Sequence, residues 1–118
     1  MLKYLKIFTL SVIVVALTMV VATDSFAAGD AAAGKAVYDA NCSPCHGADG
    51  NSPMEAMGVP SFAKGERLDK PIAERYESVC KGKESTAGMG APPMPPFCDT
   101  LSEADINNAL AYEETLKK

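Results

Sequence analysis

The 118-residue chain contains a single histidine, no tryptophan, and no cysteine before Cys42. Because His46 is the only histidine, the chain cannot supply two imidazole ligands to one metal. The lack of an early cysteine leaves no residue to carry a lipid-anchored N-terminus. Basic residues are also scarce, since 11 Lys and Arg stand against 15 Asp and Glu. This balance excludes nucleic acid as a partner, because binding to nucleic acid requires clustered Lys and Arg.

The first 27 residues have the pattern of a secretory signal peptide. Residues 1–6 carry two lysines and no acid, residues 7–22 are 16 uncharged and mostly apolar residues, and Ser25 and Ala27 supply the small residues of a cleavage site. An uncleaved membrane anchor is the alternative, but the apolar run is shorter than the roughly 20 residues of a spanning helix. Cleavage after Ala27 predicts one periplasmic domain over 28–118, without a membrane span.

Three segments have helical patterns, and no run between them alternates as a strand does. The first is predicted over about 31–40 behind the capping residue Asp30, the second over about 70–81, and the third over about 102–116. The intervening stretches are long and rich in Gly, Pro, Asn and Ser. In so small a domain, loops of this length indicate that they wrap something large and apolar. We therefore predict an all-α domain of three main helices and long loops.

The sequence Cys42-Ser43-Pro44-Cys45-His46 is the motif that carries the chemistry. C-x-x-C-H is the attachment sequence of a c-type haem, in which each cysteine forms a thioether and the histidine binds the iron. A thiol redox module using Cys42 and Cys45, or a zinc site including His46, would explain the same cysteines. Neither explains the long loops, and adjacent Cys45 and His46 are awkward ligands for one tetrahedral zinc.

A ligand on the opposite face of the iron has to come from a residue other than histidine. Of the methionines after residue 27, Met94 lies between two pairs of prolines, which stiffen the loop around it. A weak thioether ligand needs such preorganisation, because a mobile loop would lose entropy on binding. Met94 is therefore the predicted second axial ligand, with Met89 as the alternative. Met54 and Met57 are expected to pack on the haem or lie at the surface.

Two cysteines, Cys80 and Cys98, remain once the motif is assigned. Exported proteins mature in an oxidising space, so we expect a Cys80–Cys98 disulfide on either side of the Met94 loop. Two buried free thiols are the alternative.

The chain resembles the class I c-type cytochromes, in particular the small monohaem bacterial ones, over about 30–116. Gly34 and Tyr38 precede the motif as the family's glycine and aromatic residue do, and Tyr112 resembles the aromatic residue of its last helix. The resemblance implies that the Pro60 carbonyl accepts a hydrogen bond from His46 Nδ1. It implies further that His46 and Met94 bind the haem iron from opposite faces and leave no open iron site.

These observations predict an electron carrier and not an enzyme. The expected partners are an oxidase, reductase or dehydrogenase with a basic docking surface, because the chain is acidic. We expect a monomer. A haem enzyme or gas sensor with an open sixth iron site is the alternative, although the sequence offers no distal histidine. The apolar side chains expected to exclude water from the haem are Tyr38, Phe62, Ile72, Val79 and Phe97.

Overall fold

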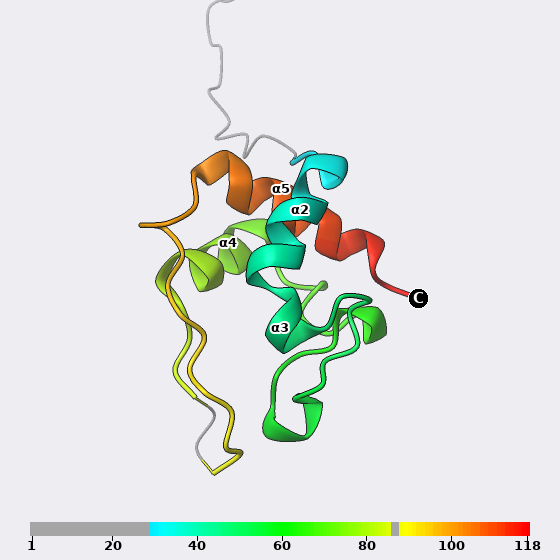
Figure 1. Ribbon diagram of the computed structural model, residues 1–118, viewed down its shortest axis with the longest axis vertical. Coiled ribbons are helices and arrows are strands. Elements are labelled where there is room, and N and C mark those ends of the chain that lie inside the picture. Colours follow the sequence, from blue (N-terminus) through cyan, green and yellow to red (C-terminus); the bar gives the residue numbers. More distant parts are fainter. Residues whose placement is uncertain (1–28, 86–87) are drawn as a thin grey trace, which may run out of the picture.

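The computed structural model describes residues 29–85 and 88–118 (Figure 1). The predicted signal peptide, residues 1–27, lies outside the described residues. In the described part the chain forms α-helices, short 3-10 helices and loops, with one isolated bridge between Lys83 and Met94 in place of a sheet. The predicted all-α class is therefore confirmed. None of the helices in this part of the chain is both long and apolar enough to cross a membrane.

The first helix of the described residues, α2 (Ala31–Asn41), begins at the predicted cap. The Asp30 side chain accepts hydrogen bonds from the amides of Ala32 and Ala33, which would otherwise lack a partner at the start of the helix. At Cys42 the chain changes direction and enters α3 (Ser43–His46), a single turn that the sequence analysis did not predict. The haem-attachment sequence therefore lies on helical backbone.

The last helix, α5 (Glu103–Thr115), lies across α2 near the top of Figure 1. Ser102 and Asp105 form a capping box, each side chain bonding to the backbone amide of the other. The two helices approach so closely that a Cβ atom on Gly34 would lie 1.8 Å from the Asn108 carbonyl oxygen. The Asp30 amide also donates to Asn108 Oδ1 over 2.7 Å. The crossing of α2 and α5 thus depends on a residue without a side chain.

The middle helix, α4 (Ile72–Lys81), starts two residues later than predicted, because Pro71 is its N-cap residue and has a ψ of 141°, outside the helical range. Of its two side chains predicted to exclude water from the haem, Ile72 and Val79, only one is buried. Val79 is buried, but Ile72 is 41% exposed and the charged Arg75 is 6% exposed. Two 3-10 helices, η1 (Glu55–Met57) and η2 (Phe62–Lys64), shape the loop between α3 and α4.

The apolar core of the described residues consists of two small clusters. One contains Tyr38, Cys42, Phe62 and Leu116, and joins α2 to η2 and the C-terminal end of α5. The other contains Val79, Ile106 and Leu110, with Met94 and Phe97 packed against it. The two clusters connect different parts of the helical frame, and the loops between them surround a cavity.

Candidate functional site

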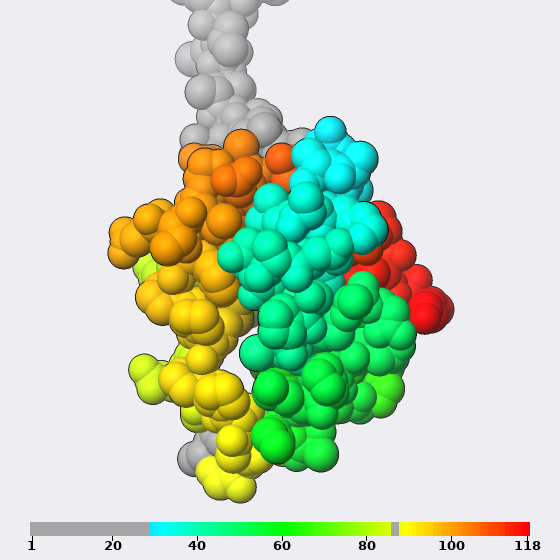
Figure 2. Space-filling view, viewed as in Figure 1, coloured from blue at the N-terminus to red at the C-terminus, as the bar shows by residue number. Residues whose placement is uncertain are grey.

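A cavity of about 280 Å³ is lined by the ends of α2 and α3, the loop around η1, the inner faces of α4 and α5, and the loop 91–97. Figure 2 shows it as a gap between the yellow loop and the teal-to-green segment. The structure brings five sequence-predicted residues to this cavity: Cys42, Cys45, His46, Pro60 and Met94. Met89, the alternative ligand, is 42% exposed and does not line it.

The two motif cysteines are held by one helical turn. The amides of Cys45 and His46 both donate to the Cys42 carbonyl, over 3.2 and 2.9 Å. Residues three apart on a helix lie on the same face, so both sulfur atoms are presented to one side of the turn. Burial raises the pKa of the Cys42 thiol to about 12. An unmodified Cys42 would therefore be a neutral thiol, which disfavours a thiolate redox reaction at this position.

His46 is oriented by two contacts. Its Nδ1 lies 3.0 Å from the Pro60 carbonyl oxygen, which can only accept, so the bond requires the proton on Nδ1. Its ring stacks on Phe62, with centroids 4.6 Å apart and an interplanar angle of 19°. Burial lowers the pKa of His46, and the bond to Pro60 opposes this effect. The imidazole is thus neutral, with the lone pair of Nε2 available for a metal.

Met94 is held in its loop by backbone contacts to the end of α4. Its amide and carbonyl exchange hydrogen bonds of 2.9 and 3.0 Å with Lys83. Gly82 lies so close that a Cβ atom there would be 2.4 Å from the Met94 carbonyl oxygen. The Met94 side chain is half-buried against the second apolar cluster. The loop is therefore fixed by more than its four prolines.

Cys80 and Cys98 lie on either side of this loop. Their Cα atoms are 4.5 Å apart and their sulfur atoms are joined. Parallel to this link, Cys98 N donates to Cys80 O over 3.2 Å and Phe97 N donates to Val79 O over 3.0 Å. The segment that follows Met94 is thus attached to the last turn of α4.

The prediction for the apolar lining was partly wrong. Phe62, Val79 and Phe97 line the cavity, but Ile72 and Tyr38 do not. Ile72 lies on the solvent side of the first turn of α4. Tyr38 is fully buried behind the cavity, where its hydroxyl donates to the Gly47 carbonyl over 2.7 Å and holds the turn after His46.

The sequence analysis missed a buried ion pair in the cavity wall, between Arg75 of α4 and Glu113 of α5. Arg75 Nη2 lies 3.0 Å from Glu113 Oε2, and both residues line the cavity. A signal was present in the sequence. Each charged residue lies on the apolar face of its helix, Arg75 four residues before Val79 and Glu113 three after Leu110. Opposite charges in such positions on two helices suggest a buried pair.

The donor set and shape of the cavity fit a haem. Two sulfur atoms and an imidazole nitrogen come from one side, a thioether from the opposite loop, and aromatic and aliphatic side chains lie between them. Among the described residues, no group of three or more His, Cys, Asp or Glu could hold a metal ion by itself. The fold and site therefore define a small helical haem-binding domain.

Comparison with known proteins agrees with this class. Residues 29–112 match the family model described as cytochrome C oxidase, cbb3-type, subunit III. Cytochrome c-554(547) of Halothiobacillus neapolitanus is 38% identical, over 76% of this chain and 100% of that protein. Cytochrome c6 of Picosynechococcus is 36% identical, over 91% of this chain and 90% of its own. No solved structure matches the chain significantly. The chain belongs to the class I c-type cytochromes, whose cofactor is covalently bound haem c with its iron.

Proposed function

We propose that the protein is a periplasmic electron carrier whose single haem has His46 and Met94 as axial ligands. Cys42 and Cys45 would hold the porphyrin by thioether bonds. The haem supplies a one-electron couple, and a histidine–methionine ligand pair raises its reduction potential. The observation that carries the proposal is the opposed placement of His46, tied to Pro60, and Met94, tied to Lys83, around one cavity.

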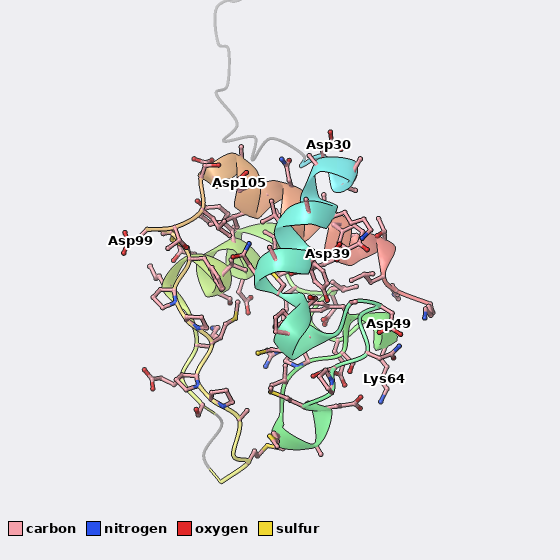
Figure 3. All side chains as sticks on the ribbon, viewed as in Figure 1. Asp30, Asp39, Asp49, Lys64, Asp99 and Asp105 are labelled. Atoms are coloured by element: carbon pink, nitrogen blue, oxygen red, sulfur yellow. A yellow bond between two sulfur atoms is a disulfide. The ribbon has the colours of Figure 1, made fainter. Side chains whose placement is uncertain are left out.

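The surface supports a carrier that docks to basic partners. Asp30, Asp49 and Asp99 are exposed and lie at the edge of the molecule in Figure 3. Acidic surface of this kind attracts a basic docking patch on an oxidase, reductase or dehydrogenase and increases the association rate. We propose further that residues 1–27 are removed on export and that the domain works as a monomer.

Two measurements on the holoprotein test the function. A pyridine haemochrome assay should find one covalent haem per chain, and the oxidised protein should show the weak sulfur-to-iron absorption band. Met94→Ala should abolish this band and lower the reduction potential, because the ligand that favours ferrous iron is lost. Met89→Ala, in the same loop but outside the cavity, is the matched control and should preserve both.

The outcome also separates the carrier from a haem enzyme or gas sensor. A wild-type protein that lacks the band and binds carbon monoxide without displacing a ligand has an open iron site, which would contradict the carrier. If the band is lost in Met89→Ala and kept in Met94→Ala, the iron ligand is Met89 and not Met94.

A further inference from the structure

Arg75 and Glu113 in the cavity wall form, with the neighbouring Glu114, a cluster of three charged residues that haem attachment does not use. Arg75 Nη2 donates to Glu113 over 3.0 Å and to the Leu110 carbonyl over 3.3 Å, and Arg75 Nη1 donates to Glu114. Arg75 and Glu113 are 6% and 5% exposed, so this cluster joins α4 to α5 inside the protein.

The charges of the cluster do not balance when all three residues are ionised. One guanidinium faces two carboxylates, which leaves one excess negative charge. The Glu114 side chain is 52% exposed, so water stabilises its charge, whereas the Glu113 side chain is 6% exposed. The excess charge is therefore most costly on Glu113. Burial raises the pKa of Glu113 to about 7, and the bond and charge of Arg75 oppose the rise.

The other groups that face Glu113 are neutral near neutral pH. On α2 these are Tyr38 and Cys42, whose pKa values are both raised by burial and by the charge of Glu113. In the holoprotein Cys42 would be an uncharged thioether. The remaining charged residues of the cavity wall are exposed: Arg67, Lys70, Glu74, Lys83 and Glu84. A change of charge inside the cavity would therefore act mainly on the protonation of the Glu113 carboxylate.

We infer that Glu113 is a redox-linked proton site. Its carboxylate binds a proton from water more tightly when a donor protein has delivered an electron to the site, so that part of a proton is taken up per electron and released when the electron leaves. Glu113 lines the cavity that contains Cys42, and the added electron is a negative charge in that cavity. Like charges in a buried environment favour protonation of the carboxylate. The inference rests on the proposed haem binding.

The test is the midpoint potential of the holoprotein between about pH 5 and about pH 9, the range around the Glu113 pKa of about 7. We expect the reduced protein to bind the proton about tenfold more tightly, which is within the usual range of coupling between two sites. This tenfold difference corresponds to a fall of about 59 mV in potential as the pH rises through the window.

Glu113→Gln should give a potential that does not change in this window and stays near the low-pH value of the wild type. Glu103→Gln, an exposed position on the same helix, is the control and should keep the wild-type dependence. Glu114→Gln should move the window to lower pH, because Arg75 is then available to Glu113 alone. A Glu113→Gln protein that keeps the wild-type dependence would overturn the inference.

A second measurement needs no variant. Wild-type holoprotein in unbuffered solution should take up a fraction of a proton on reduction near neutral pH, visible with an indicator dye. Full reduction without proton uptake would overturn the inference while leaving the electron carrier intact. A chain without covalent haem would instead contradict the proposed function.

Discussion

At the scale of single residues, the packing of α2 on α5 depends on Gly34. Its missing side chain lets the Asn108 carbonyl approach, and the atoms that a Cβ would meet are backbone atoms of α5. Backbone within a helix cannot rotate away as a side chain can, so any substituent has to separate the helices.

Gly34→Ala should therefore destabilise the protein by roughly 2 kcal/mol or more, even though alanine is the better helix former. Chemical denaturation of the holoprotein measures this loss. Gly88→Ala is a useful contrast, because Gly88 has φ +80° and nothing within 4 Å of an added Cβ. That variant should lose only about 1 kcal/mol from backbone strain. A Gly34→Ala protein as stable as the wild type would contradict the close crossing.

Glu113 should also make stability depend on pH. Burial raises its folded-state pKa to about 7, above the ordinary glutamate value of 4.5. Its contribution to stability is therefore fully present below about pH 4.5 and is lost as the pH rises through about 7. Denaturation of the protein in one fixed redox state should show this fall, and Glu113→Gln should reduce it. If the stability of the wild type and of Glu113→Gln depends on pH equally, a group other than Glu113 is responsible.

At the scale of the elements, the sequence predicted those features that depend on nearby residues. The caps Asp30 and Ser102 act within three residues, so the starts of α2 and α5 were predicted correctly. Met94, which the prolines beside it singled out, lies in the cavity wall, and its role as an iron ligand stays a prediction. Features that depend on tertiary packing were not predicted. Ile72 is exposed although it is apolar, and Arg75 is buried although it is charged, because its partner Glu113 lies 38 residues away in the sequence.

The link between α4 and the Met94 loop gives a prediction about ligand exchange. Replacing both Cys80 and Cys98 by alanine should destabilise the protein by about 3 kcal/mol in the chain-entropy model. It should also let imidazole displace Met94 at lower concentration, because the segment after Met94 is then held only by backbone hydrogen bonds and by the packing of Phe97. Titration followed by the sulfur-to-iron band measures this. Reactive thiols in the unreduced, denatured wild type would show that Cys80 and Cys98 do not pair.

At the scale of the whole molecule, the described chain has two small apolar clusters and a cavity in place of one continuous core. A domain of this size buries little surface by itself and commonly requires a cofactor or cross-link for stability.

The variant in which Cys42 and Cys45 are both alanine should therefore fail to reach the native fold, although its helices keep their caps. Near-ultraviolet circular dichroism and the dispersion of amide proton signals would report this loss against the wild-type holoprotein. A well-dispersed native spectrum of the variant without haem would show that the two clusters are sufficient.

The crossing of α2 and α5 also determines when the domain can form during synthesis. Gly34 packs on the backbone of Asn108, so α2 has its partner in α5, far along the sequence. Contacts between such distant residues form slowly, and this contact cannot form until α5 has left the ribosome. The same glycine that allows the two helices to touch thus makes folding of the domain wait for the synthesis of α5.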